Sequence, residues 1–423
     1  MRFKPRRNDP LYGSLLETDF YQFTVGQLAF LRHPDVQTSF EFINRTSGER
    51  LADIIPIGAL RDELDALRDL KFTPAELHYL NGTYEYNSRM FDPRYIKYLE
   101  GFRLPAYQLL VRDGQFALYF DGPWPEAMMW ETFALGAVNA LRNEVLTKDL
   151  SLTARKELEA RARIKLCDKL RTIAGSDESL TLSDFGTRRA YSPKWQYEAD
   201  EMCLEILGKR FRGTSNVHNA MRLGVTPMGT SSHQAPMIYS AVFWDGTKEG
   251  LIKSHRAFLD DWYELYDQGL SIFLPDTFGS KFFYDHVVDE ERLRQWKGSR
   301  QDSGSPFEYA IEILARYRRY GIDPHDKLLV FSDGLTHEDI VKLYADFGQH
   351  IQVSFGWGTH LTNDFPGLKP ISIVVKPVAA NGRPVCKLSD NIQKATGTPE
   401  TVQIYRELVE YDAAHMLSKP AEV

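Results

Sequence analysis

The segment GVTPMGTSSHQAP, residues 224–236, places one histidine among small and hydroxyl-bearing residues. A neutral imidazole in such a place can attack phosphorus as a nucleophile. Neighbouring N–H and O–H donors can stabilise the phosphoryl group that it receives. A structural histidine at the start of a helix would fit the same segment. His233 is therefore a candidate nucleophile, with the structural role as the alternative.

Two further segments, LPDTF and SRQDSGSP, each carry an aspartate where a β-like run ends. Carboxylates at such ends, here Asp276 and Asp302, can hold the hydroxyls of a ribose or a Mg²⁺ ion that itself carries phosphates. Arg300 can clamp a carboxylate or a phosphate with two parallel hydrogen bonds. Helix capping would account for Asp302 and Ser305, but it does not account for Arg300.

Glycine-rich turns follow two apolar runs, in VFSDGLT and SFGWGTHLTND. Each turn leads toward a helix, so that backbone N–H groups and the helix dipole face any bound anion. In β/α barrels the loops after the late strands often hold a phosphate. Two ordinary turns are the alternative for either loop alone. The candidate phosphate-binding residues are Ser332, Gly334, Gly356, Gly358 and Thr359.

The segment SDFGTRRAYS offers an aromatic side chain followed by two guanidinium groups. Phe185 at a strand end can stack on a planar ring, and Arg188 and Arg189 can bind phosphate. A core phenylalanine beside a solvated basic pair explains the same spacing.

Short β-like runs recur from about residue 179 and alternate with helical patterns. They are SLTLSDFG, FRGTS, VTPMGTSS, LSIFLPDTF, GSRQDSG, KLLVFSDG and QVSFGWGT, with EAMMWETFALG as a candidate eighth. A capping box from Ser305 to Glu308 and another from Thr336 to Asp339 mark two of the helix starts. This alternation predicts a mainly parallel sheet, and the number of runs favours a β/α barrel with its chemistry at the carboxyl ends of the strands.

The N-terminal part mixes element types, as an α+β domain does. TSFEFINRT alternates like a strand, FDPRYIKYLEGF has a helical pattern, and AYQLLVRDGQFALYFDG predicts a hairpin around its Asp-Gly pair. A second hairpin is expected at the Asn-Gly pair of KPISIVVKPVAANGRPVCKLSD. The fold class predicted is α/β, with an irregular β/α barrel and a discontinuous α+β domain. The α+β domain comprises residues 1–125 with 375–423, and the barrel of residues 126–374 carries most of the active site.

The composition is that of a globular protein, with 43% hydrophobic and 26% charged residues among 423. The formal net charge of -7 argues against nucleic acid as a partner, because nucleic-acid binding depends on cationic side chains. Three scattered cysteines offer no zinc spacing and fit a reducing compartment. With neither a signal peptide nor a membrane-spanning run in evidence, we expect a cytoplasmic protein without membrane contact.

Taken together and in order, the segments resemble the nicotinate phosphoribosyltransferase family. The matching pieces run from about residue 12 to about residue 390 and include LLETDFYQFTVGQLAF, FEFINRT, DGPWPEAMMWETFALGAVN, SDFGTRRAYS, GTSNVHNAMRLGVTPMGTSSHQ, LPDTF, RQDSGSP, LVFSDGL, SFGWGTHLTND and KLSD. Their collinear order makes the resemblance specific, although no single piece would carry it.

The resemblance implies an enzyme of NAD salvage that joins nicotinate to 5-phosphoribosyl 1-pyrophosphate, forming nicotinate mononucleotide and pyrophosphate. ATP hydrolysis is coupled to this reaction through a phosphohistidine, and His233 occupies the matching position. Mg²⁺ is expected with the pyrophosphate near Asp276 and Asp302, with no direct protein ligand assigned. The family's fold is an α/β domain beside an irregular β/α barrel, and its unit is a homodimer with shared active sites.

The resemblance also assigns roles to single residues. Phe185 matches the residue that stacks on the pyridine ring, and Tyr21 matches an aromatic that the partner subunit offers. Arg300 matches the arginine that faces the ring substituent, and Arg188 matches a residue near the phosphates. Asp276 and Asp302 match carboxylates near the ribose and the metal-bound pyrophosphate, and the glycine turns match the cradle of the 5′-phosphate.

The nicotinamide-using sister family is the sharpest alternative. It carries an aspartate where this chain has Ser215, and a carboxylate there would repel nicotinate. Serine together with Arg300 therefore favours nicotinate. Quinolinate enzymes of this fold lack the histidine of GTSSH, and the chain lacks the cysteines of a C-terminal zinc knuckle. A non-catalytic phosphosugar-binding barrel is the remaining alternative, and the intact set of acids, arginine and histidine argues against it.

Overall fold

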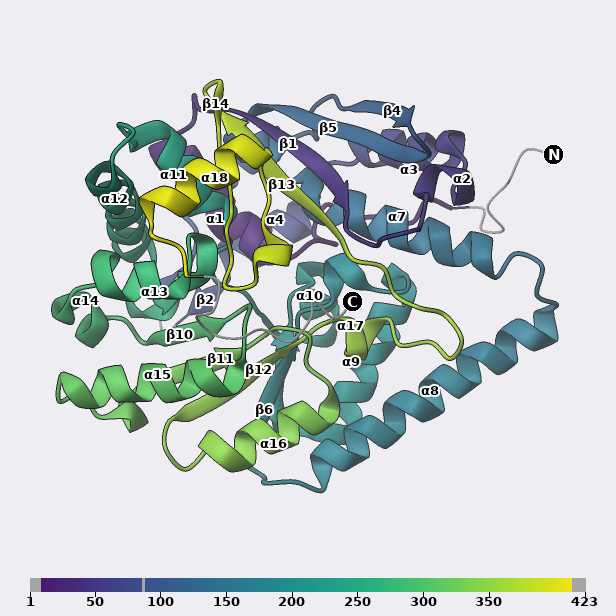
Figure 1. Cartoon of the computed structure of the whole chain (residues 1–423). Helices are drawn as coiled ribbons and strands as arrows, with labels where there is room; N and C mark the ends of the chain where they lie inside the picture. The colour runs from purple at the N-terminus through teal and green to yellow at the C-terminus, as the bar shows by residue number, and fades with distance from the viewer. Residues whose placement is uncertain (1–8, 86–87, 413–423) are drawn as a thin grey trace.

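The computed structural model describes residues 9–85 and 88–412, which form a mixed α/β fold with two main sheets (Figure 1). The antiparallel sheet lies at the top of Figure 1, and the parallel strands lie below it with helices along their outer side. This two-part architecture is the one that the alternation of β-like and helical segments predicts.

The antiparallel sheet has the strand order β14-β13-β1-β5-β4. The bounds are β1 (Gln37–Asn44), β4 (Gln108–Arg112), β5 (Gln115–Pro123), β13 (Ile373–Ala380) and β14 (Arg383–Pro384). Both predicted hairpins are present, and the Asn381-Gly382 turn has φ values of 47° and 73°. Since β13 pairs with β1, a late segment of the chain completes the N-terminal sheet, as a discontinuous domain requires. The domain boundaries stay a prediction.

The parallel sheet has the order β8-β7-β6-β12-β11-β10-β9 and curls into the irregular barrel. Among the described residues no ladder joins the edge strands β8 and β9, so hydrogen bonds do not close the barrel on that side. All seven β-like runs from residue 179 onward are strands. Their bounds are β6 (Thr181–Asp184), β7 (Phe211–Thr214), β8 (Thr226–Pro227), β9 (Ile272–Phe273), β10 (Gly298–Gln301), β11 (Leu328–Phe331) and β12 (Gln352–Trp357).

The candidate eighth strand, EAMMWETFALG, is wrong. This segment lies in α6 (Trp124–Ala127) and α7 (Trp130–Leu146). Every side chain of α7 from its first residue to Asn143 is buried, so the helix shows no polar face. Periodicity alone cannot distinguish a helix that is buried on all sides from a buried strand.

The helices are capped largely as their sequences predict. Thr336 and Asp339 form a reciprocal capping box, whereas Ser305 caps its helix through the Glu308 N–H alone. No helix in the described part of the chain has both the length and the apolarity of a membrane span. The remaining bounds are α1 (Tyr21–Arg32), α2 (Leu51–Ile54), α3 (Ile57–Asp69), α4 (Pro74–Asn81), β2 (Tyr84–Glu85), β3 (Ser88–Arg89), α5 (Pro93–Glu100), α8 (Leu152–Ala174), α9 (Pro193–Leu207), α10 (Val217–Leu223), α11 (Gln234–Phe243), α12 (Lys248–Tyr266), α13 (Ser280–Phe282), α14 (Glu290–Gln295), α15 (Pro306–Arg319), α16 (His337–Phe347), α17 (Thr359–Thr362) and α18 (Pro399–Leu408).

Helix α7 connects the two sheets. It contacts β13 of the antiparallel sheet and the turn of residues 187–189 that follows β6. Asn139 donates to the Arg188 carbonyl at 3.1 Å, and Asn143 donates to the Tyr191 carbonyl at 3.0 Å. Glu131, in the first turn of α7, pairs with Lys376 of β13 at 2.9 Å. The buried helix therefore fixes the antiparallel sheet against the carboxyl ends of the parallel strands.

Candidate active site

A cavity of about 330 Å³ lies between the carboxyl ends of the parallel strands and the antiparallel sheet. It brings together nearly all the residues that the sequence singles out. The predicted residues that line it are Tyr21, Phe185, Arg188, Ser215, His233, Arg300, Asp302, Ser332, Gly334, Gly358 and Thr359. Asp276 and Gly356 do not line it.

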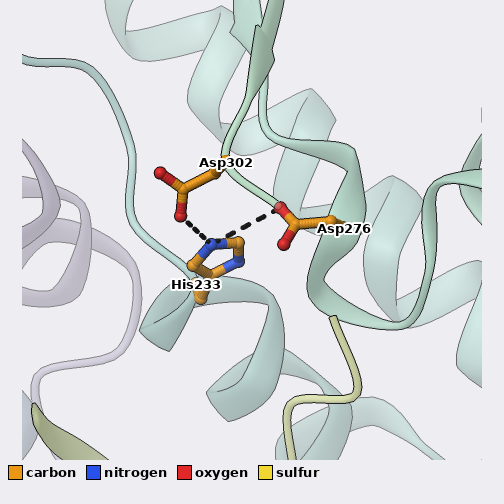
Figure 2. Close-up of side chains that lie close together, drawn as sticks. All are labelled: His233, Asp276 and Asp302. Carbon is orange, nitrogen blue, oxygen red and sulfur yellow. Dashed lines mark hydrogen bonds and ion pairs between the residues drawn. The ribbon is translucent and has the colours of Figure 1, made fainter. Parts of the chain in front are cut away.

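His233 is buried at the residue before α11, and both of its ring nitrogens have partners. Nδ1 lies 3.0 Å from Thr277 Oγ1, and Nε2 lies 3.0 Å from Asp302 Oδ2. Nε2 also lies 3.5 Å from Asp276 Oδ1. Figure 2 shows the two carboxylates approaching the same nitrogen from the ends of neighbouring strands. The imidazole is therefore held in one orientation.

Lys387 adds a cation to this group. Its Nζ lies 2.9 Å from His233 Nε2 and 3.0 Å from Asp276 Oδ2. Burial and the Lys387 charge lower the pKa of His233 to about 4, despite the nearby carboxylates. Burial acts to raise the pKa of Asp276, but Lys387 and His233 outweigh it and lower that pKa to about 2. The site thus holds a neutral imidazole beside ionised carboxylates at neutral pH.

Asp276 lies behind the cavity wall. Its Oδ2 accepts hydrogen bonds from Ser303 Oγ at 2.7 Å and from Ser389 Oγ at 3.2 Å. Asp302 is more open, with 23% of its side chain exposed, and its Oδ1 accepts from Ser332 Oγ at 2.9 Å. Of the two acids, Asp302 is the one that can touch a molecule in the cavity, whereas Asp276 acts on Lys387 and His233.

Phe185 and Tyr21 supply aromatic surface to the cavity. The Phe185 N–H donates to the Trp357 carbonyl at 2.9 Å, which fixes the start of the turn after β6. Gly356 of β12 makes room for the ring, since a Cβ there would lie 2.2 Å from Phe185 Cδ2. A second cavity of about 530 Å³ inside the barrel shares Phe185 and Arg300 as lining residues. Gly356 thus gives the Phe185 ring its space, and its predicted contact with phosphate stays a prediction.

Ser215 lies beside a carboxylate that the sequence did not single out. Asp19 is 1% exposed and lines the same cavity, and an isolated antiparallel bridge joins it to Asn216, the residue after Ser215. Burial raises the pKa of Asp19, and Arg188, whose Nη1 lies 3.5 Å from its Oδ2, opposes that shift. Ser215 was expected to avoid the repulsion between a carboxylate and nicotinate. The Asp19 carboxylate nevertheless lies next to Ser215, with Arg188 partly compensating its charge.

The glycine turns lie beside a group of half-buried arginines. Ser332 N–H donates to the Gln301 carbonyl at 3.0 Å, and Gly334 has φ of 57°, a left-handed conformation that favours glycine. Arg45 and Arg189 line the cavity beside these turns. Burial, with the nearby Arg188 and Arg45 charges, lowers the pKa of Arg189 to about 10. Packed like charges of this kind are stabilised when an anion binds between them.

Comparison with known families assigns the chain. The model of the nicotinate phosphoribosyltransferase family matches residues 180–413, and the model of that family's N-terminal domain matches residues 16–139. The chain belongs to the nicotinate phosphoribosyltransferase family.

Solved structures of nicotinate phosphoribosyltransferases share the fold over their whole length. The protein from Porphyromonas gingivalis superposes with a TM-score of 0.82 at 27% sequence identity, covering 95% of this chain and 100% of that one. The protein from Vibrio cholerae superposes with a TM-score of 0.86 at 26% identity, covering 97% and 96%. The irregular barrel with its antiparallel partner sheet is therefore the fold of the nicotinate phosphoribosyltransferase family.

The position of Tyr21 bears on the expected sharing of active sites between subunits. The resemblance assigned Tyr21 to a site in the partner subunit, and that assignment stays a prediction; within this chain Tyr21 lines the cavity described above. The preceding residues are held there by barrel segments, since the Phe20 N–H donates to the Ser215 carbonyl at 2.8 Å and the Val217 N–H donates to the Thr18 carbonyl at 3.1 Å. One chain thus brings Tyr21 to the same cavity as Phe185.

Spacing and composition did not point to several of the cations in this nicotinate phosphoribosyltransferase fold. They come from segments far from the barrel motifs: Arg45 follows β1, Lys376 lies in β13, and Lys387 and Lys394 follow β14. Lys394 pairs with Asp333 in the first glycine turn. The segments FEFINRT, which contains Arg45, and KLSD, which contains Lys387, were part of the family resemblance and were the available signals.

Proposed function

We propose that this protein is a nicotinate phosphoribosyltransferase, which joins nicotinate to 5-phosphoribosyl 1-pyrophosphate and releases pyrophosphate. The observation that carries the proposal is the single cavity that collects Phe185, Arg300, His233 and the glycine turns in a chain of this family. Because the product is a pyridine mononucleotide, the reaction belongs to NAD salvage.

The pyridine ring binds between the aromatic side chains. Phe185 and Tyr21 offer faces for stacking, and Arg300 offers a guanidinium to the carboxylate of nicotinate. Arg300 Nε is buried and has no hydrogen-bond partner in the described residues, which leaves a donor free for a ligand. The ring nitrogen attacks with its own lone pair, so the site must orient ring and sugar and needs no general base.

Bond breaking at the sugar develops positive charge at C1. The C1–O bond to pyrophosphate breaks, its electron pair leaves with pyrophosphate, and the pyridine nitrogen forms the new bond to C1. Asp302, ionised and open to the cavity, stabilises the oxocarbenium-like charge. The turns at Gly334 and Gly358, with Arg189, bind the 5′-phosphate.

The cluster of His233, Asp276 and Asp302 suits a divalent ion such as Mg²⁺ only in part. Ligand atoms of His233, Asp276 and Asp302 lie within 4.8 Å of one another. Lys387 Nζ already lies 3.0 Å from Asp276 Oδ2, so Asp302 is the carboxylate available to Mg²⁺. Mg²⁺ bound with the substrate would neutralise the charge of the departing pyrophosphate.

ATP coupling uses His233. A ring nitrogen of the neutral imidazole attacks the γ-phosphorus of ATP, the bond from that phosphorus to the bridging oxygen breaks, and ADP leaves with the electron pair. The low pKa of His233 keeps the imidazole nucleophilic at neutral pH. Lys387 lies close enough to offset the negative charge of the phosphoryl group that the ring would carry.

The test is a product assay with a matched histidine control. The full chain with Mg²⁺, ATP, nicotinate and 5-phosphoribosyl 1-pyrophosphate should yield nicotinate mononucleotide, and nicotinamide in its place should yield far less product. Mg·ATP alone should add one acid-labile phosphoryl mass, which His233→Ala loses. His325→Ala should retain the added mass, because His325 is exposed and does not line the cavity. A wild-type chain that makes no mononucleotide and gains no mass contradicts the proposal.

A further inference from the structure

A chain of buried polar groups behind the cavity wall leads from α9 to Ser215. Gln196 of α9 is 1% exposed. Its Nε2 donates to Asp184 Oδ2 at 2.6 Å and to Thr187 Oγ1 at 2.9 Å, while its Oε1 accepts from Asn216 Nδ2 at 3.0 Å. Thr187 Oγ1 in turn lies 2.7 Å from Ser215 Oγ.

The chemistry of the amide sets the direction of these hydrogen bonds. Both protons of the Gln196 NH₂ group are used, one toward Asp184 and one toward Thr187. The opposite amide orientation would turn an acceptor toward the Asp184 carboxylate and a donor toward the NH₂ of Asn216, so the partners select the orientation described. Thr187 therefore accepts from Gln196 and has its own proton left for Ser215.

Ser215 stands at the end of this relay. Since its oxygen accepts from Thr187, its own proton is directed away from Thr187 and is available to a molecule in the cavity that Ser215 lines. A hydroxyl proton suits the carboxylate of nicotinate, an acceptor without a donor. The NH₂ group of nicotinamide needs an acceptor at the same point.

We propose that Gln196 is a specificity-determining residue that acts through Thr187 to make Ser215 a hydrogen-bond donor to the ring substituent. The inference rests on the proposed function, because it takes the substituent of the pyridine ring to lie against Ser215 and Arg300. Gln196 does not line the cavity, so it is a positioning residue.

Gln196→Glu tests the relay by changing one NH₂ group into an oxygen. Beside Asp184 the new carboxyl is protonated, donates to Asp184 and accepts from Thr187. Thr187 then accepts the proton of Ser215, and Ser215 turns lone pairs toward the cavity. We expect the ratio of the nicotinamide inhibition constant to the nicotinate KM to fall about tenfold, the size of one hydrogen bond to a charged group. The KM for 5-phosphoribosyl 1-pyrophosphate should stay within about twofold of the wild-type value.

A double-variant cycle separates this relay from general damage to the site. Thr187→Val cuts the connection, so adding Gln196→Glu to it should leave the ratio where Thr187→Val alone puts it. Thr187→Ser keeps the hydroxyl and should keep the wild-type ratio. If Gln196→Glu does not fold, Thr187→Val and Thr187→Ser still decide the matter, because equal ratios in both overturn the inference.

The outcomes also distinguish the inference from the function on which it rests. A wild-type chain that forms no mononucleotide overturns the proposed function. A wild-type chain that prefers nicotinate, with a Gln196→Glu ratio unchanged or an effect that persists beside Thr187→Val, overturns the relay alone.

Discussion

Gly356→Ala should displace the aromatic platform on which the pyridine ring stacks. A Cβ at this position would lie 2.2 Å from Phe185 Cδ2, 2.5 Å from Cε2 and 2.8 Å from Cγ. Ordinary carbon contacts need about 3.5–4.0 Å, so the ring must retreat by roughly 1 Å or more. Overpacking of this kind costs about 1–3 kcal/mol of stability, and a displacement of about 1 Å in a reacting complex can cost on the order of 100-fold in rate. We expect a lower Tm and a nicotinate kcat/KM reduced 10- to 100-fold, as orders of magnitude.

Steady-state kinetics with each substrate varied and thermal unfolding check this expectation. The KM for 5-phosphoribosyl 1-pyrophosphate should change much less than the KM for nicotinate. Gly101→Ala is the matched control, since its new methyl would lie 3.9 Å from the nearest atom. Gly356→Ala should cost no stability once Phe185→Ala has removed the ring. Unchanged Tm and unchanged nicotinate kinetics in Gly356→Ala would show that the position of Phe185 does not depend on this glycine.

Three further expectations follow from the site. The rate of His233 phosphorylation should fall only when the pH drops to about 4, since the lowered pKa of His233 keeps its ring neutral and nucleophilic above about pH 4. Stopped-flow or quench measurements in which the rate already falls near pH 6.5 would contradict this. Arg300→Met should raise the nicotinate KM about 10- to 100-fold through loss of a charged hydrogen bond, while Arg300→Lys should recover part of it, as measured by initial rates. Mixing Tyr21→Ala with His233→Ala should give no more activity than the two variants give separately, because both side chains line one cavity of one chain; a gain on mixing would point to sites shared between subunits.

The barrel could be predicted because its strands end in chemically marked turns. Each β-like run from residue 179 onward stops at small or polar residues, and each is a strand. The segment that forms α7 was wrongly predicted as a strand, because a helix buried on every side has no polar stripe to identify it. Tertiary enclosure, which local periodicity cannot register, decided that element.

The residues of the candidate site also fall into those that the sequence predicted and those that it did not. Arg300, Asp302 and the turns at Gly334 and Gly358 were found because strand ends concentrate at one edge of a parallel sheet. Asp19 and Lys387 were not, because they reach the cavity from segments far from the strand ends in sequence. Contacts of that kind depend on how the sheets pack together, which spacing does not encode.

The most direct test of the proposed site is a crystal structure of the full chain with nicotinate mononucleotide. We expect the pyridine ring between Phe185 and Tyr21 of one chain, its carboxylate on Arg300 and Ser215, and the 5′-phosphate at the turns of Gly334 and Gly358. A mononucleotide bound away from this cavity, or with its ring remote from Phe185, would show that these residues do not form the nicotinate site.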